Sequence, residues 1–544
     1  MNRTGKSLVR AFIAVGFLLP ARIAFAQSSN DSLEAGFKNP PDSAKPRVWW
    51  HWTGGNVTKQ GITKDLEWMK RVGIGGAQMA DIGQGSGQTI TNPITFFTPE
   101  WFDTVKFAAS ESDRLGLEMS IFSCSGWSET GGSWVKPEQA MKKLVWSEAR
   151  VPGGSSFVGP LPRPPDTTGP FQDVPVEWDP ATFAGPIPKT PVPALYHDVA
   201  VIAYRVPTAD RTLQELHPTL TSSIGAINGN TLWDGSFTQP LHLRLGDEAQ
   251  PAWIQMDFGH PQSIRSMSVG MQHVWDGISP RYTVAILEAS DDGRDFHRVA
   301  NAYDLNDNSR MGLIPLEVTI AFTPVRARFF RLLFPAPPKA PIDPLLAKQL
   351  PPPPTERLVT EFVLYTTPRV DHFEQKAGYF LDAGLDPHAT PHVDAADAID
   401  PKSIVDVTRF ITSDGTLRWT PPPGRWAVLR FGYSLLGTTN HPATPEATGL
   451  EVDKLNSASV KSYMEGYLER YFAIVDRDRT GRLRIDALVN DSYEAGAQNW
   501  TEELPDEFRR RRGYDPRPWL PAMTGRIIGS SRQPTNFSGT CAAH

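Results

Sequence analysis

The hydrophobic pattern of residues 47–146 alternates between strand and helix periods. RVWWHW (47–52), IGGAQMADIG (74–83) and LEMSIFSCSGW (117–127) are apolar runs of strand length. Two segments with helical spacing separate them. The first has Ile62, Leu66, Met69 and Val72 on one face, with Thr63 as the expected cap and Gly73 as the expected end; the second starts at Thr98-Pro99-Glu100, runs to Leu115 and stops at Gly116. This order predicts parallel strands with right-handed crossovers.

Beyond residue 146 the helical period disappears. Residues 147–207 are Pro-rich and irregular, and residues 208–368 read as an all-β module. A second β segment, 369–440, contains FITSDGTLRWTPPPGRWAVLRFGYS (410–434), which has the pattern of a hairpin. The strands expected in the all-β module are INGNTLWDGS, PAWIQMDFG, SIRSMSVGM, YTVAILEASDDGRDFHRV and ARFFRLLF.

Residues 441–530 return to the β/α pattern. A helix is expected from about residue 455, an apolar strand buried on both faces at 483–489, and a further helix from Pro505 to the arginines before Gly513. We interpret 441–530 as the continuation of 27–146. The predicted fold class is therefore α/β, a partial (β/α)8 TIM-type barrel of about four strands interrupted by β-sandwich insertions. The expected face of the first helix consists of Leu455, Val460, Met464, Tyr467, Leu468 and Phe472.

The two ends of the chain differ from the rest. Arg3, Lys6 and Arg10 precede a short apolar run, and Ala24-Phe25-Ala26 fits a cleavage site, so residues 1–26 are expected to be a signal peptide. This predicts a periplasmic or secreted protein without a membrane span. Residues 531–544 lack apolar periodicity and read as an aberrant tail, for which a frameshift and a natural early stop with a disordered tail are the two hypotheses.

Composition narrows the classes of function. A length of 544 residues suggests about three domains, and a net charge of −6 gives no electrostatic case for a nucleic-acid partner. The chain has 16 Trp, which suit the apolar faces of sugar rings, although core packing is the alternative. The chain has only two cysteines, Cys124 and Cys541, which is too few for a framework of disulfide bonds.

The stretch DSYEAGAQNW (491–500) carries the clearest candidate chemistry. It follows the strand expected at 483–489, so Glu494 lies beyond a strand's C-terminal end, where barrel enzymes place catalytic groups. A loop-anchoring or capping acid is the alternative. The other candidates are His51, Trp52, Asp81, Ser123, Trp127, Glu129, Asn440, His441, Glu451 and Asp491. Core packing competes with function for His51 and Trp127, and a turn cap competes for Asp81.

Four stretches together carry a family resemblance. They are WWHWTGGNVTKQGITKDLEWMKRVGIGGAQ (49–78), SGWSETGGSWVKPEQAMKKLVWSE (125–148), TTNHPATPEATGLEVDKL (438–455) and DSYEAGAQNW…FRRRRGYDPRPWLPAMTGR (491–526). The chain resembles the α-L-rhamnosidases of glycoside hydrolase family 106 over nearly all of residues 45–528. Residues 208–368 separately resemble a discoidin-type galactose-binding-like module, through WIQMDFG, LEASDDGRDF and ARFFRLLF.

The family resemblance implies an inverting exo-glycosidase that removes terminal α-L-rhamnose from an oligosaccharide, polysaccharide or glycoside. It implies that Glu494 is the general acid, that the base lies on a later barrel strand outside this sequence, and that calcium is bound by ligands beyond residue 544. We expect the substrate-binding residues to be His51, Trp52, Asp81, Trp127, Asn440, His441 and Asp491.

Because the base is not in this sequence, the chain alone is expected to be inactive. Two rival readings remain. The first is a non-catalytic carbohydrate-binding or inert fragment. The second is a retaining glycosidase with both carboxylates in this chain, about 5 Å apart.

Overall fold

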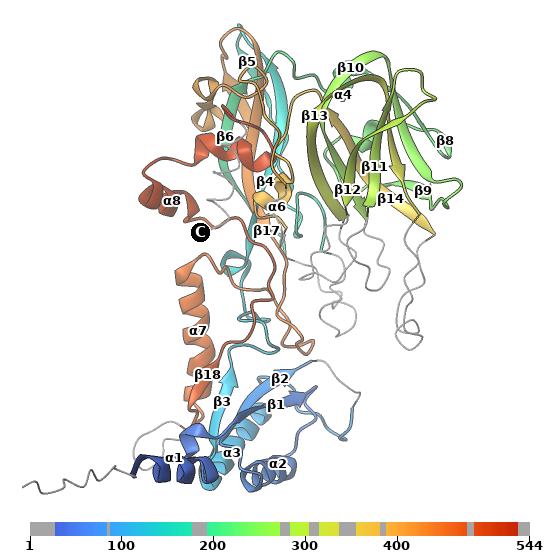
Figure 1. The fold of residues 1–544 in the computed structure, drawn as a ribbon. Coiled ribbons are helices and arrows are strands. Elements are labelled where there is room, and N and C mark those ends of the chain that lie inside the picture. Colours follow the sequence, from blue (N-terminus) through green and yellow to red (C-terminus); the bar gives the residue numbers. More distant parts are fainter. Residues whose placement is uncertain are drawn as a thin grey trace, which may run out of the picture.

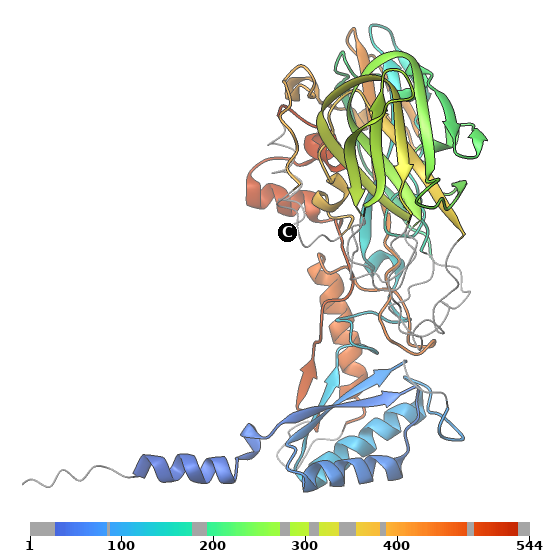
Figure 2. The ribbon, with the colours of Figure 1, turned by 45° about the vertical axis from the view of Figure 1, so that its right-hand side comes forward.

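The computed structural model describes residues 28–83, 88–176, 193–272, 283–303, 315–336, 355–380, 388–475 and 484–530. A β/α part lies at one end of the molecule and antiparallel β-structure at the other, with helix α7 (Ser457–Phe472) rising between them (Figures 1 and 2). The expected signal peptide and the tail 531–544 lie outside the described residues. Within the described residues, every helix is too short or too polar to cross a bilayer.

A four-stranded parallel sheet forms the centre of the β/α part. Its strands, in spatial order, are β1 (Arg47–Thr53), β2 (Gly76–Ile82), β3 (Glu118–Phe122) and β18 (Ala487–Val489). The predicted parallel pairing is therefore confirmed, and residues 441–530 do return to the sheet that residues 27–146 begin. The described strands form an open sheet that does not close into a barrel.

Helices α2 (Lys59–Arg71) and α3 (Pro99–Leu115) pack together beside this sheet. Helix α3 has the predicted ends, with Thr98 as its cap and Gly116 in the left-handed conformation. The predicted cap of α2 is wrong: Thr58 caps it, because the helix starts earlier, and Thr63 donates instead to Glu111 on α3. Val72 follows the helix end and is half exposed, so it does not join the buried face.

The opposite face of the parallel sheet is only partly covered. Successive strand residues point to opposite faces, so Trp50 and Trp52 enter the helix-side core while Trp49 is 55% exposed. The prediction that the last strand is buried on both faces is wrong. Leu488 of β18 is 37% exposed, because no strand in the described parts of the chain pairs with the outer edge of β18.

A second, antiparallel sheet unites segments that lie far apart in the sequence. Its strands, in order, are β15 (Val405–Asp406), β6 (Tyr196–Arg205), β17 (Arg425–Leu435) and β4 (Lys142–Pro152). The predicted hairpin at 410–434 is wrong: β16 (Thr416–Trp419) pairs with β5 (Phe157–Pro160), because β4 and β6 occupy both edges of β17. The segments 147–207 and 369–440 thus form one unit.

The all-β module has its own core, whose buried members all lie between Leu213 and Leu364. INGNTLWDGS is not a strand as predicted but contains the 3-10 helix η4 (Asn230–Leu232), because its Gly, Asn and Asp residues favour turns. Eight strands form the sheet: β7 (Thr219–Ser222), β8 (Gly225–Ala226), β9 (Leu241–Arg244), β10 (Ala252–Gln272), β11 (Thr283–Ser290), β12 (His297–Tyr303), β13 (Pro315–Phe334) and β14 (Glu356–Tyr365).

Two predicted helices exist but pack differently from expectation. Helix α8 (Leu504–Arg512) buries Leu504 and Phe508 in the core of the antiparallel sheet and not against the parallel sheet (Figure 1). Of the face predicted for helix α7, Tyr467 is buried, Val460, Met464 and Leu468 pack partly against the same core, and Phe472 is 46% exposed. Tyr463 and Tyr471, which the prediction left out, are also buried. The tyrosine hydroxyls reach carbonyl groups at the end of β3, which a purely apolar face could not satisfy.

Candidate active site

Glu494 lies in the loop after β18, and three side chains hold its carboxylate. Oε2 accepts a hydrogen bond from Trp127 Nε1 at 3.0 Å and lies 3.1 Å from His441 Nε2. Oε1 accepts a hydrogen bond from Ser492 Oγ at 2.6 Å. The Glu494 side chain is 35% exposed, so the carboxylate remains accessible from one side. Trp127 and His441, both predicted site residues, are therefore brought together with Glu494.

The His441 ring lies between Glu494 and the backbone of its own loop. His441 Nδ1 lies 3.1 Å from the carbonyl oxygen of Thr439, which can only accept, so Nδ1 carries a hydrogen. His441 Nε2 lies within hydrogen-bond distance of Glu494 Oε2, so the imidazole can exchange a proton with a carboxyl group that acts as an acid catalyst.

The loops that carry Trp127 and His441 are in close contact. The backbone N–H groups of Trp127 and Ser128 donate to the His441 carbonyl at 3.1 and 3.3 Å, and His441 N donates to Ser128 Oγ at 2.8 Å. Gly126 has a φ of +85°, and a Cβ there would lie 2.4 Å from the His441 carbonyl oxygen. Only glycine permits this approach, which fixes both Glu494 partners relative to each other.

Asn440 braces the loop and does not face a substrate, which corrects the prediction. Its side chain is fully buried. Nδ2 donates to the Ser125 carbonyl at 2.9 Å, and Oδ1 accepts from Gly449 N at 2.9 Å. These bonds join the loop after β3 to the loop before α7, so a sugar hydroxyl has no access to the amide.

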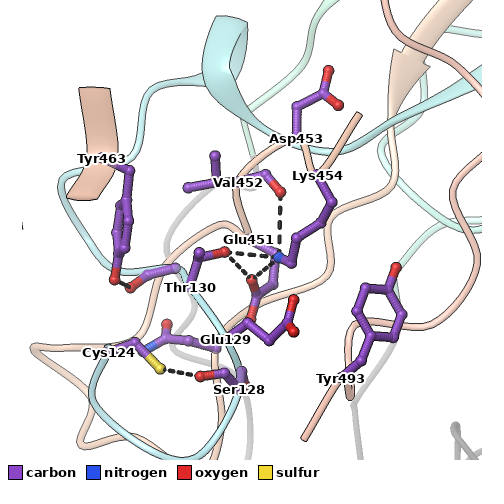
Figure 3. A network of polar contacts seen from close by, with 12 residues as sticks. Cys124, Ser128, Glu129, Thr130, Glu451, Val452, Asp453, Lys454, Tyr463 and Tyr493 are labelled. Carbon is purple, nitrogen blue, oxygen red and sulfur yellow. Dashed lines mark hydrogen bonds and ion pairs between the residues drawn. The ribbon is translucent and has the colours of Figure 1, made fainter. Parts of the chain in front are cut away.

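Glu451 has a similar bracing role (Figure 3). Its Oε2 accepts from Thr130 Oγ1 at 2.7 Å and from Lys454 Nζ at 2.5 Å, and the side chain is fully buried. Tyr463 donates to the Gly131 carbonyl at 3.1 Å in the same network. The contacts with Lys454 and Thr130 tie together residues of two loops inside the protein. Glu451 thus fixes the loop on which Trp127 lies.

Three aromatic rings line the open face of the parallel sheet next to Glu494. The His51 ring centroid lies 5.5 Å from that of Trp49 and 6.1 Å from that of Trp127. We call Trp49, His51 and Trp127 the aromatic strip. Partial burial lowers the pKa of His51, and the nearby charge of Asp491 opposes this shift. Asp491 itself has a buried Oδ2 without a hydrogen-bond partner in the described residues.

Trp52 and Asp81 do not reach this face, which corrects two further predictions. Trp52 is 2% exposed and packs edge-on against Trp50 in the helix-side core. Asp81 is buried and accepts from Ser125 Oγ at 2.6 Å. Burial raises the pKa of Asp81 to about 7, with the Ser125 hydrogen bond opposing the shift and Glu446 adding to it.

Ser123 and Glu129, two further predicted candidates, form hydrogen bonds within the loops around Glu494. Ser123 Oγ donates to the Glu129 carbonyl and to Asn490 Oδ1, and Asn490 Nδ2 donates to Glu129 Oε1. The sequence reading missed Asn490 and Ser492, for which no pattern gave a signal. It also missed Trp49, although the two-residue period of WWHW places Trp49 on the same face as His51.

The described residues around Glu494 do not by themselves make a calcium site. Calcium takes about six to eight oxygen ligands, whereas the Glu494 carboxylate is held by indole, imidazole and hydroxyl groups. Within the described residues, three side chains suited to a metal gather elsewhere, at Asp371, His372 and His388. Calcium at this site therefore remains a prediction that depends on ligands from outside this sequence.

Comparison with known proteins places the chain in a family. A family profile described as alpha-L-rhamnosidase, glycoside hydrolase family 106, matches residues 38–538. A solved rhamnosidase from Novosphingobium sp. PP1Y is 37% identical, with a TM-score of 0.74, over 94% of this chain and 44% of that chain. A curated relative from Formosa agariphila, named putative beta-glucuronidase, is 25% identical over 528 residues, which are 96% of this chain and 29% of the relative.

The chain thus spans less than half the length of either relative. The profile match nevertheless covers both the parallel sheet with Glu494 and the β-structure inserted into it. The chain belongs to glycoside hydrolase family 106, the α-L-rhamnosidase family.

Proposed function

We propose that this chain carries the general-acid side of an inverting α-L-rhamnosidase site, with Glu494 as the acid. The observation that supports this most directly is the 3.1 Å contact between His441 Nε2 and Glu494 Oε2, on a carboxylate that remains partly exposed. Family membership supplies the class of substrate, a terminal α-L-rhamnoside. The likeness to the solved rhamnosidase supports the same assignment.

In this proposal the glycosidic oxygen lies against Glu494, which gives up its proton as the bond to the leaving group breaks. Trp127 and His441 hold the carboxyl group, and His441 supplies the next proton to it. The exposed ring of Trp49 in the aromatic strip stacks against the apolar side of the sugar. Asp491, beside His51, accepts a hydrogen bond from a sugar hydroxyl.

Inversion needs a second carboxylate about 6.5–9.5 Å away that activates water. We propose that this base, together with calcium ligands, belongs to a part of the barrel outside this sequence. Calcium would bind sugar hydroxyls there and fix their orientation. The chain alone is then inactive, and the open face and edge of the parallel sheet receive the remaining strands. We also propose export, on the basis of residues 1–26.

The decisive test is Glu494→Gln in a chain that hydrolyses rhamnosides, or the matching substitution in the Novosphingobium rhamnosidase. Turnover of natural rhamnosides should fall about 10²–10⁴-fold, because the leaving group then lacks its proton. Aryl rhamnosides with acidic phenols should lose much less. Glu469→Gln is the matched control, since Glu469 is exposed on α7.

Equal loss on both substrates would refute the acid role of Glu494. NMR of the sugar first released separates inversion from retention, because a retaining enzyme gives the α-anomer. Aryl β-glucuronide should be assayed in parallel, in view of the name given to the Formosa relative. Hydrolysis of the glucuronide without hydrolysis of the rhamnoside would overturn the proposed specificity.

A further inference from the structure

A cluster of metal-binding side chains lies far along the chain from the Glu494 loop. Asp371, His372 and His388 each offer one ligand atom, and these atoms all lie within 4.8 Å of one another. The cluster borders α6 (Phe373–Lys376), a short helix in contact with β13 of the all-β module. It is independent of the proposed glycosidase site.

The two imidazole rings face the same carboxylate oxygen. His372 Nδ1 lies 2.7 Å from Asp371 Oδ2, and His388 Nδ1 lies 3.9 Å from the same atom. The two rings stack with centroids 3.7 Å apart. In a zinc site, two ligands each about 2.0–2.1 Å from the ion and tetrahedrally arranged are about 3.4 Å apart. The Asp371–His372 separation is shorter than this value and the Asp371–His388 separation is longer, so the two stacked rings must move apart for both to bind one ion.

The backbone holds the cluster in place. Ala321 N on β13 donates to Asp371 Oδ1 at 2.7 Å, and His372 N donates to the Thr319 carbonyl at 2.7 Å. Lys376 Nζ donates to the His388 carbonyl. These contacts fix the Asp371 carboxylate and the backbone that carries the two histidines. Such outer contacts are what tune a metal-binding histidine or carboxylate.

The burial of Asp371 and His372 favours a bound ion over a simple hydrogen bond between these two side chains. Asp371 and His372 are both more than nine-tenths buried. His372 Nε2 has no hydrogen-bond partner in the described residues. His372 also adopts a φ of +52°, which is uncommon for a residue with a side chain.

We propose that Asp371, His372 and His388 bind a divalent transition metal of the zinc class. Two imidazoles and one carboxylate suit zinc, whereas calcium prefers oxygen ligands alone. The ion is structural in this proposal. It ties residues 371–372 and His388 together at a segment already bonded to β13, while Phe373 packs into the core of the antiparallel sheet. The metal thereby fixes the all-β module to the rest of the chain.

The test uses the untagged full chain, stripped with a chelator and then titrated with ZnCl₂ and CoCl₂. We expect one equivalent of zinc to remain after dialysis, and tetrahedral Co²⁺ to give visible d–d absorption bands that zinc abolishes. His372→Gln and His388→Gln should each lose the bound zinc. His392→Gln is the matched control, because His392 lies in the same segment with a side chain that is 88% exposed.

Absence of retained zinc in the wild-type chain would overturn the proposal, as would equal zinc retention in the two variants and the control. Should the variants fail to fold, the Co²⁺ spectrum of the wild-type chain decides. Its tetrahedral d–d bands should reach their full intensity at one equivalent of cobalt. Absence of these bands would also refute the site.

Discussion

At the scale of single residues, neighbours on a strand can differ completely in burial. Trp49 and Trp52 belong to one tetrapeptide, yet one is largely exposed and the other lies in the core. Trp52→Ala should lower the free energy of unfolding by about 3–5 kcal/mol, because it leaves a cavity beside Trp50. Trp49→Ala should change stability by less than about 1 kcal/mol and weaken rhamnoside binding. Urea denaturation compares the two variants, and equal destabilisation would contradict the assignment of faces.

Asp81 should make the stability of the chain depend on pH. Its pKa is about 7 in the folded chain and 3.8 in an exposed reference. Between about pH 4 and pH 7 the unfolded carboxyl is ionised while the folded one keeps its proton. The free energy of unfolding therefore falls, by the order of 1 kcal/mol per pH unit, as pH rises through this window, and levels off above pH 7.

Asp81→Asn should remove this part of the pH dependence, as measured by urea midpoints from pH 4 to pH 8. Other buried carboxyl groups also have a raised pKa, among them Glu361 and Glu374, so the difference between wild type and variant is the relevant quantity. Asp103→Asn, at an exposed position, is the control. Parallel curves for wild type and Asp81→Asn would show that Asp81 titrates normally.

At the scale of elements, the site depends on loops that approach each other closely. Gly126→Ala should destabilise the chain by more than about 2 kcal/mol, because the positive φ and the contact with the His441 carbonyl both oppose a Cβ. Displacement of this carbonyl should also move His441 away from Glu494. Differential scanning fluorimetry of this chain measures the first effect, and rhamnoside turnover by the matching variant of the Novosphingobium rhamnosidase measures the second.

Gly466→Ala in α7 is the control for this substitution. A Cβ at Gly466 meets no atom within 4 Å, and alanine favours a helix over glycine, so this variant should gain about 0.5–1 kcal/mol. A Gly126→Ala chain as stable as wild type would show that the two loops can separate without cost.

At the scale of the whole molecule, an open parallel sheet is an unusual surface. Parallel sheets are normally covered on both faces, and a free strand edge invites association. We expect the chain to associate increasingly with concentration in sedimentation velocity. Leu488→Lys on β18 should reduce this association, whereas Val405→Lys, at an equally exposed edge position of the antiparallel sheet, should not. A monomeric wild type at all concentrations would contradict the prediction.

The all-β module should behave differently, because its core is its own. Residues 208–368 expressed alone should unfold cooperatively. Failure to fold would show that contacts with α6 and the antiparallel sheet are needed for its stability.

The sequence by itself determined what local chemistry decides. Thr98, Pro99 and Gly116 defined α3 because caps and left-handed glycines act within one turn of a helix. The alternation of strand and helix predicted parallel pairing, and the position after β18 singled out Glu494. The two-residue period of WWHW also places Trp49 and Trp52 on opposite faces of the strand. The prediction did not use this period.

Only the tertiary structure decided what depends on distant partners. Strand β17 could not be matched to β4 and β6 from its own sequence, because pairing is set by the burial of several segments at once. Asn440 reads as an exposed loop amide until the carbonyl of Ser125 is placed beside it. The exposure of Leu488 likewise follows from what lies beyond the sheet edge. A residue's neighbours in space, unlike its helical or strand period, are not encoded next to it in the chain.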